Sequence, residues 1–443
     1  MLPDLASANR RIAKGTNRMA REDQTTVGGS GAAGAALKRL RPASRPAAER
    51  EARLLDGRAW EEFCARLLEA GRFVRDFPLP DSPELRAEGY RYLLGLVHSG
   101  LLQAGALADA DRPRFVRNPD SLAKWGAENA DNQYLWARIR PDAAYRIHGR
   151  RESAFDFLIE VKEGYMQLGD DRNFATLAAH DLVLAPDASF EVRLAAEPPP
   201  GFAGNFLPLH PDARYVAIRQ YFQDWARESP ARFTIERIGG AGEPPPPLAP
   251  AEMAERLSRA GEWTLTSTRF WADWVTQLRA AWQPGRLAPP RRFVGGADDI
   301  LYGNDWWKLG PEEALVIESE VPDARYWAFQ LCDVWFRTLE YASRQTSVNG
   351  AQAVLDADGR FRAVVAHRDP GVPNWLDTGG QPEGMLQYRF VWARSSPQPS
   401  ARVVPFAALR EALPPGHPVV TPEQRRRALA AREAHLQRRE PAT

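Results

Sequence analysis

The sequence has 443 residues, with 58 lysines and arginines against 57 aspartates and glutamates, so its formal net charge is +1. A chain of this length is expected to form about two or three domains with a sizeable hydrophobic core. The balanced charge argues against a nucleic-acid partner, and the lack of about 18 consecutive apolar residues argues against a membrane span. The N-terminus has no apolar signal core, which favours a cytoplasmic protein.

The first 111 residues divide into a polar tail and a helical region. Residues 1–45 are rich in Gly, Ala, Ser and basic side chains, which predicts a disordered tail. Within this tail, Gly29–Gly34 matches a dinucleotide-binding fingerprint. The segment before it is polar and lacks the buried strand that this fingerprint needs, so we favour a linker. Over 46–111, apolar residues recur at helical spacing, and Ser82 followed by Pro83 marks a helix start.

From residue 112 the apolar period changes, and residues 112–240 are predicted to form strands. Residues 145–148 and 155–159 are expected to pair as strands around a polar turn, and 182–194 to form a hairpin. A proline-rich run then opens a linker at 241–294.

Helical patterning returns in this linker, at 251–260 and at 266–282. A second strand-rich region follows at 295–400, and its clearest expected hairpin covers 351–365. The tail at 401–443 carries a charged helix, whose opening signal is Thr421-Pro422-Glu423.

The two strand-rich regions contain similar segments in the same order, which indicates an internal duplication. The matched segments are Asp131–Ile139 with Asp323–Leu331, Val183–Phe190 with Val354–Phe361, Asn205–Leu207 with Asn374–Leu376, and Gln220-Tyr221 with Gln387-Tyr388. Short antiparallel strands in two such copies predict a mainly β, α+β fold with two β-sandwich or jelly-roll-like domains. The N-terminal helical region and the helical linker would cover or join them.

Other motifs do not support a cofactor or a metal ion. His367-Arg368-Asp369 with Asn374 has the spacing of a kinase catalytic loop, but no Gly-rich lid and no Asp-Phe-Gly accompany it. The seven histidines include no closely spaced pair of the kind that cupin-type metal sites use. The two cysteines, Cys64 and Cys332, are too few for a disulfide framework and favour buried thiols. We therefore predict no cofactor and no metal.

The second copy concentrates the polar and aromatic residues that form ligand sites at strand ends. Asp369 and Asp377 are candidate acid and base residues, and Arg344 is expected to hold an anionic group. The candidate substrate-binding residues are Tyr326, Gln330, Asp333, Asn349, His367, Asn374 and Trp375. The structural alternative is that Asp369-Pro370-Gly371 forms a turn, that Asn374 caps a turn, and that Trp375 belongs to the core.

Residues 296–394 resemble the bacterial domain-of-unknown-function family numbered 1214. The segments that carry the resemblance are Glu313–Glu318, Arg325–Trp327, Gln330–Asp333, Arg344–Ser347, Asn349-Gly350, His367–Gly371 and Asn374–Asp377. The resemblance covers about a quarter of the chain. It implies a mostly β fold and a bacterial protein, and it supplies no activity.

The leading functional hypothesis is a cofactor-free enzyme that acts on a polar small molecule, either carbohydrate-like or a hydroxy acid. Its site would lie in the second copy or in the cleft between the copies. The alternative is a non-catalytic ligand-binding or assembly protein that uses the same cleft. The expected partner is a small-molecule ligand, and formation of a homo-oligomer stays open.

Overall fold

The computed structural model describes residues 45–79, 82–240, 242, 244–293 and 299–440. The predicted disordered tail, apart from Arg45, and the Gly29–Gly34 motif lie outside the described residues. The α-helices are α3 (Ala47–Leu55), α4 (Arg58–Asp76), α5 (Pro83–Ala104), α6 (Pro250–Ala281), α7 (Leu409–Ala412) and α8 (Pro422–Arg439). Short 3-10 turns are η1 (Met166–Leu168), η2 (Ala179–Asp181) and η3 (Phe406–Ala408). Within the described residues, no helix is both long and apolar enough to cross a membrane.

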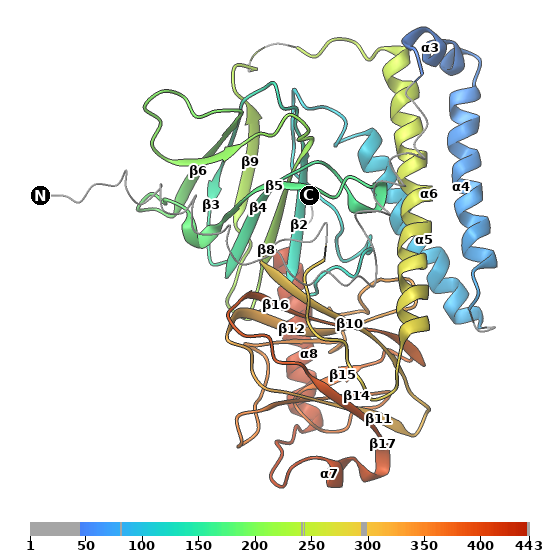
Figure 1. The fold of residues 1–443 in the computed structure, drawn as a ribbon, viewed down its shortest axis with the longest axis vertical. Coiled ribbons are helices and arrows are strands. Elements are labelled where there is room, and N and C mark those ends of the chain that lie inside the picture. Colours follow the sequence, from blue (N-terminus) through green and yellow to red (C-terminus); the bar gives the residue numbers. More distant parts are fainter. Residues whose placement is uncertain (1–44, 80–81, 241, 243, 294–298, 441–443) are drawn as a thin grey trace, which may run out of the picture.

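The first β-sandwich consists of two sheets, which lie at the upper left of Figure 1. One sheet has the order β1-β2-β8-β4-β5 and the other β7-β6-β3-β9. Its strands are β1 (Val116–Arg117), β2 (Asn132–Arg138), β3 (Tyr145–Arg150), β4 (Asp156–Lys162), β5 (Asn173–Ala178), β6 (Ser189–Ala195), β7 (Asn205–Pro208), β8 (Tyr215–Tyr221) and β9 (Arg232–Arg237). Alternate residues of β4, such as Phe157 and Ile159, point into the core between the two sheets.

The second β-sandwich lies below the first and has sheets of order β10-β16-β12-β13 and β15-β14-β11-β17 (Figure 1). Its strands are β10 (Ile300–Lys308), β11 (Glu313–Ser319), β12 (Ala324–Cys332), β13 (Ser347–Asn349), β14 (Phe361–Ala366), β15 (Trp375–Asp377), β16 (Glu383–Ala393) and β17 (Ser400–Pro405). Phe329, Leu331 and Tyr388 fill the core between these sheets. The predicted α+β fold with two β-rich sandwiches is confirmed.

The two sandwiches have the same strand order once β1 is set aside. Each strand from β2 to β9 has the same place in its sheet as the corresponding strand from β10 to β17, taken in chain order. Each sandwich also has one parallel pair of strands, β6–β7 in the first and β14–β15 in the second. The sequence match of Asn205 with Asn374 falls at equivalent strands. The match of Asp131–Ile139 with Asp323–Leu331 does not, because it aligns β2 with β12, which holds the position of β4.

All three expected strand pairings have a different structure. Residues 182–185 are irregular backbone ahead of β6, so 182–194 does not form a two-stranded hairpin. Strands β3 and β4 do not pair with each other, because β3 pairs with β6 and β9 whereas β4 pairs with β8 and β5. Residues 351–354 form turn and irregular backbone in place of a strand. Asn374 Oδ1 accepts a hydrogen bond from the N–H of Val354, and Asn374 Nδ2 donates one to the C=O of Val354. The backbone groups of Val354 are therefore not available for a ladder of hydrogen bonds between strands.

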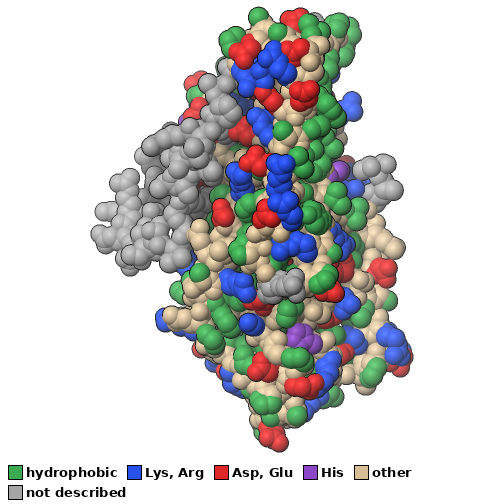
Figure 2. Space-filling view, turned by 90° about the vertical axis from the view of Figure 1, so that its right-hand side faces the viewer, with side chains coloured by type: hydrophobic (Ala, Val, Ile, Leu, Met, Phe, Trp, Pro, Cys, Tyr) green, Lys and Arg blue, Asp and Glu red, His purple; other side chains and the backbone are tan. Residues whose placement is uncertain are grey.

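The helices α4, α5 and α6 pack together along one side of the molecule (Figure 1). The linker forms one continuous helix, α6, where the sequence predicted two. Gly261 in its middle lies against Phe63 and Arg66 of α4, so the lack of a side chain allows the two helices to approach. Figure 2 shows this helical side, with hydrophobic side chains gathered along one edge of its upper part.

The charged helix predicted near the C-terminus is α8, and it runs from the second sandwich up to the first (Figure 1). Thr421 forms a capping box with Gln424 at its start. Near this end, Arg425 donates to Asp369 of the second sandwich, with Nε 3.0 Å from Oδ2. At the other end, Arg438 donates to the carbonyl of Trp225 in the first sandwich. The helix therefore bridges the two sandwiches.

Candidate functional site

The three residues predicted to be catalytic do not form one cluster of contacts. Arg344 Nη1 lies 2.8 Å from Asp377 Oδ2, so this predicted pair is brought together. Asp369 instead contacts Arg425 of α8, and its Oδ1 accepts a hydrogen bond from the backbone N–H of Gly371. The two carboxylates are thus held by different arginines, and Asp369 has the role of a turn residue.

Three predicted binding residues are engaged within the second sandwich. Asn374 is fully buried, and its amide bonds the backbone of Val354 and the carbonyl of Arg362. The indole N–H of Trp375 donates to the carbonyl of Ala366. His367 lies 2.9 Å from the Thr378 hydroxyl through Nδ1 and 3.3 Å from the Leu309 carbonyl through Nε2.

Three of the remaining four predicted residues contact the first sandwich, and the fourth, Asp333, does not. Tyr326 Oη lies 2.6 Å from Asp131 Oδ2, and Asn349 Nδ2 lies 3.0 Å from Asp131 Oδ1. Gln330 accepts from the N–H of Ala130 and donates to the carbonyl of Glu128. Asp333 forms an ion pair with the buried Arg337. None of the ten predicted residues is among the described residues that line the pocket below.

A pocket of about 160 Å³ lies where the two sandwiches and α6 meet. Its walls come from the outer faces of β2, β8, β10 and β16, from α6, and from the loops at 125–128 and 164–167. The aromatic residues that line it are Trp125, Tyr134, Trp136, Tyr165, Tyr221, Trp271, Trp274, Phe293, Tyr302 and Phe336. Strand alternation explains this wall, because every second residue of β2 and β8 points away from the sandwich core.

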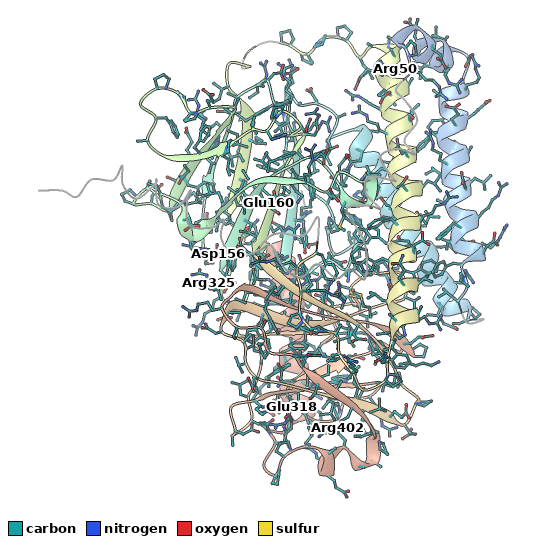
Figure 3. The ribbon with its side chains drawn as sticks, viewed as in Figure 1. Arg50, Asp156, Glu160, Glu318, Arg325 and Arg402 are labelled. Atoms are coloured by element: carbon teal, nitrogen blue, oxygen red, sulfur yellow. The ribbon has the colours of Figure 1, made fainter. Side chains whose placement is uncertain are left out.

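Three cationic residues, Lys162, Arg219 and Arg389, also line the pocket. Arg219 Nε lies 2.8 Å from Glu160 Oε2, and Lys162 Nζ lies 3.6 Å from Glu160 Oε1. Burial acts to raise the pKa of the Glu160 carboxyl, but Arg219 and Lys162 outweigh it and hold that pKa below its usual range. Figure 3 shows Glu160 on the first sandwich, above its junction with the second.

Arg389 differs from the other two cations because no carboxylate pairs with it among the described residues. It is 5% exposed, its Nη2 donates to the carbonyl of Ala127 at 3.1 Å, and its guanidinium lies over the ring of Tyr302. A buried charge without a counter-ion is costly, so an anion beside Arg389 would be stabilising.

The loop at 125–128 brings an acid to the pocket wall. Burial raises the pKa of Glu128 to about 8, and the positive charge of Lys124, whose Nζ lies 4.0 Å from Glu128 Oε1, opposes this shift. The backbone of this loop turns at Gly126 and Ala127, which both have positive φ angles. Because the pKa of Glu128 lies above 7, this carboxyl group is mostly neutral at pH 7.

Buried polar atoms in the lining have no hydrogen-bond partner within the described part of the chain. They include Tyr221 Oη, Gln167 Nε2, Trp271 Nε1, Arg389 Nε and Glu128 Oε1. Buried polar groups in folded proteins are normally paired, so these atoms are available to a bound molecule. No group of three or more His, Cys, Asp or Glu side chains in the described residues is placed to hold a metal ion.

Sequence analysis missed this pocket for two reasons. Its residues are spread from Pro119 to Arg389, and only the packing of the two sandwiches brings them together. The available signal was the alternation on β8, where Ala217, Arg219 and Tyr221 share one face. A strand that faces solvent has the same alternation, so the pattern does not distinguish a pocket from a surface.

One solved structure resembles the chain closely over most of its length. It is an uncharacterized protein from Burkholderia cenocepacia with 35% sequence identity and a TM-score of 0.76, and the alignment covers 81% of this chain and 99% of that one. The chain belongs to the same family as this Burkholderia protein. The VPA0106 protein from Vibrio parahaemolyticus has a TM-score of 0.45 and 12% identity, covering 71% of this chain and 98% of that one. No curated protein matches the chain.

The family description that matches part of the chain is "Protein of unknown function (DUF1254)", over residues 275–365. This corrects the resemblance to family 1214, which has no match. The match at 275–365 starts on α6 and ends within β14, so it includes the end of the long helix as well as strands. The proposed segments from 367 onward lie beyond it.

Proposed function

We propose that the pocket between the two sandwiches binds a small organic anion that has a flat apolar body. The single observation that carries this proposal is Arg389, a buried guanidinium in an aromatic pocket that no carboxylate of the described residues pairs with. Its planar fork of N–H groups suits a carboxylate.

The charges around the pocket favour an anion over a neutral ligand. Glu160 lies beside Arg219 and Lys162, and Glu128 is mostly neutral at pH 7 because its pKa is about 8. Arg389 therefore contributes a positive charge that no carboxylate of the described residues offsets. This favours the hydroxy acid of the sequence-based hypothesis over the carbohydrate-like molecule.

The size and walls of the pocket limit the ligand to about one ring with small substituents. Its volume of about 160 Å³ is close to that of the engineered apolar cavity, about 150 Å³, that holds one benzene molecule. Trp271 of α6 and Tyr302 of β10 are among the aromatic residues of the lining, against which an aromatic or other planar body gains from stacking.

The test uses benzoate as the anionic probe and benzamide as its neutral isostere, with binding measured by isothermal titration calorimetry. Arg389→Gln removes the cation, and Ala217→Leu fills the pocket from β8 without changing its charge. Arg432→Gln is the matched control, because Arg432 is buried to 6% exposure but contacts Tyr341 and Ser347 outside the pocket. Near-UV circular dichroism checks that each variant is folded.

The proposal expects benzoate to bind the unchanged protein and the Arg432→Gln variant, and benzamide to bind more weakly. Loss of Arg389 should weaken benzoate binding about tenfold or more, because a charge-assisted hydrogen bond is lost. If a panel of small aromatic and hydroxy carboxylates fails to bind, or if Ala217→Leu binds benzoate as well as the unchanged protein, the proposal is wrong.

A second candidate function is acid–base catalysis in the same pocket. Glu128 favours it, because a carboxyl group with a pKa of about 8 is protonated at pH 7 and can act as a general acid. In this case Glu128→Gln would abolish turnover of a ligand identified by binding and leave its affinity within about threefold. The acid–base roles of Asp369 and Asp377 remain a separate prediction, which the substitutions Asp369→Asn and Asp377→Asn test in the same assay.

We also infer that the two sandwiches, at 112–240 and 295–400, arose by internal duplication. The shared strand order supports this, and so do Asn205 and Asn374, whose amides make equivalent bonds to the backbones of Val183 and Val354. A cytoplasmic location and a homo-oligomer remain predictions from the sequence.

A further inference from the structure

A second cavity, of about 430 Å³, lies between the helices and the first sandwich. Side chains of α3, α4 and α6 line one side of it, and the ends of β2 and β8 line the other. Figure 3 shows one lining residue, Arg50, at the upper end of the helices. Tyr165 belongs to the lining of both this cavity and the aromatic pocket, so the two spaces are neighbours.

Most charges that line this cavity are already paired. Within the lining, Arg45 and Arg53 pair with Glu62, and Arg50 pairs with Glu255. Three other lining residues pair with residues outside the lining. Arg259 pairs with Glu252, and Glu163 and Asp212 both pair with Arg172. Asp170 and Glu262 also take part in interactions of their own.

Three further arginines in the lining, Arg66, Arg138 and Arg214, have no carboxylate partner in the described part of the chain. The guanidinium of Arg138 makes no hydrogen bond there, and it lies over the ring of Tyr215 at 4.7 Å. Arg214 donates through Nη1 to the carbonyls of Pro211 and Ala213 only. Arg66 donates through Nη1 to the carbonyl and hydroxyl of Ser258.

These three side chains keep most of their N–H donors available toward one cavity. Each guanidinium has five donors and stays charged at any physiological pH. The buried indole Nε1 of Trp263 also lines the cavity and has no hydrogen-bond partner among the described residues. The acids in the lining have partners or interactions of their own, so the donors of these three arginines are left for another anion. Arginines with unused donors recognise phosphoryl groups and multiply charged carboxylates.

We propose that this cavity is a second ligand site, separate from the aromatic pocket, which binds an anion of two or more negative charges. Arg138 and Arg214 contribute from the first sandwich, and Arg66 contributes from α4. Such an anion would offset two or more of these positive charges, and the volume of about 430 Å³ admits a molecule larger than one ring. The bound anion would also join α4 to the first sandwich.

The experiment measures binding of inorganic pyrophosphate and of citrate to the full chain by isothermal titration calorimetry. All titrations are made in sodium chloride at one fixed ionic strength, so that general screening is constant. The site variants are Arg138→Gln and Arg214→Gln. The control is Arg402→Gln, because Arg402 also donates to a carbonyl, that of Ala412, and lies in the lower sandwich far from Arg50 (Figure 3).

At least one of the two anions should bind, and each site variant should weaken its affinity about tenfold, while Arg402→Gln leaves it unchanged. Preference for pyrophosphate over citrate would assign a phosphoryl ligand, and the reverse preference a polycarboxylate. Arg389→Gln should leave this affinity unchanged, which separates the result from the fate of the aromatic pocket. If neither anion binds, or if both site variants bind like the unchanged protein, the second site does not exist.

Discussion

Asp156 of the first sandwich and Arg325 of the second form an ion pair across their junction, with Arg325 Nη2 2.8 Å from Asp156 Oδ2 (Figure 3). Asp156 is fully buried, and its Oδ2 also lies 2.8 Å from His180 Nδ1. A buried carboxylate that loses one of its partners becomes destabilising, so this pair ties the stability of each sandwich to its neighbour.

The substitution Arg325→Gln should therefore lower the free energy of unfolding by about 1–2 kcal/mol, less than for a fully buried pair because Arg325 is 46% exposed. Urea denaturation followed by tryptophan fluorescence measures the change. Arg394→Gln is the control, because its ion pair with Asp323 is exposed and should contribute less than about 0.5 kcal/mol. Equal losses in the two variants would contradict a special role for the junction pair.

Asn205 and Asn374 are predicted to stabilise the two sandwiches to a similar degree. The Asn205 amide bonds the backbone N–H and C=O of Val183 and donates to the carbonyl of Glu191. The Asn374 amide bonds the same two groups of Val354 and donates to the carbonyl of Arg362. The substitution Asn374→Ala, or Asn205→Ala, should cost about 2–4 kcal/mol, because buried backbone groups lose their partners. Thermal denaturation measures this. Unchanged stability in Asn374→Ala with loss of ligand binding would instead support the substrate-binding role predicted for Asn374.

The elevated pKa of Glu128, about 8, predicts a pH dependence of stability. The unfolded chain ionises this carboxyl near pH 4.5, whereas the folded protein keeps it protonated up to about pH 8. Protonated Glu128 therefore favours the folded state fully below pH 4.5, and this contribution is lost as the pH rises to 8. Compared with Glu128→Gln, the unchanged protein should lose a few kcal/mol between pH 5 and 8. Parallel melting curves of both proteins over this range would contradict the shift.

Helix α8 contains the second predicted pH-sensitive group, His435. Burial, together with the positive charges of Arg439 and Arg438, lowers the pKa of His435 to about 3. Because this folded-state pKa lies below the ordinary value of 6.5, stability should be lost as the pH falls from 6.5 to 3. The substitution His435→Phe keeps a ring against Trp225, where the ring centroids are 4.9 Å apart, but it does not titrate. Its acid unfolding, followed by circular dichroism, should begin at a lower pH than that of the unchanged protein.

The two aspartates predicted to be catalytic should differ in their effect on stability. Asp369 neutralises Arg425, which is buried and also donates to Gln345, so Asp369→Asn should destabilise the protein by about 2 kcal/mol. Asp377 contacts Arg344, whose side chain is half exposed, so Asp377→Asn should cost less than about 1 kcal/mol. Faster proteolysis within α8 in the Asp369→Asn variant alone would locate the effect.

Local chemistry in the sequence predicted those elements whose determinants lie within a few residues. Ser82 accepts from the N–H of Leu85 at the start of α5, and Thr421 and Gln424 form the predicted start of α8. The α+β fold class also followed from alternation along the strands. The hairpin at 351–365 failed because Asn374, far along the chain, takes the backbone bonds of Val354.

The face of the strand on which a side chain lies explains why the candidate site was only partly predictable from the sequence. Gln220 and Gln387 were matched in the sequence, yet Gln220 lies opposite Phe157 and faces the sandwich core, while Gln387 lines the pocket between the sandwiches. A shift of one residue in a strand reverses the face of each side chain, and the sequence alone does not fix that register. The location in the cleft between the copies was nevertheless among the predicted alternatives.

The position of α8 in the chain also sets an order for assembly during synthesis. Both sandwiches precede this helix, so each can emerge from the ribosome and fold before the bridge that joins them exists. The buried arginines Arg432 and Arg439 then reach carbonyl groups of Tyr341 and Ala130, which belong to different sandwiches. Until that last step, the aromatic surfaces beneath α8 stay exposed, and the nascent protein is most vulnerable to aggregation in this interval.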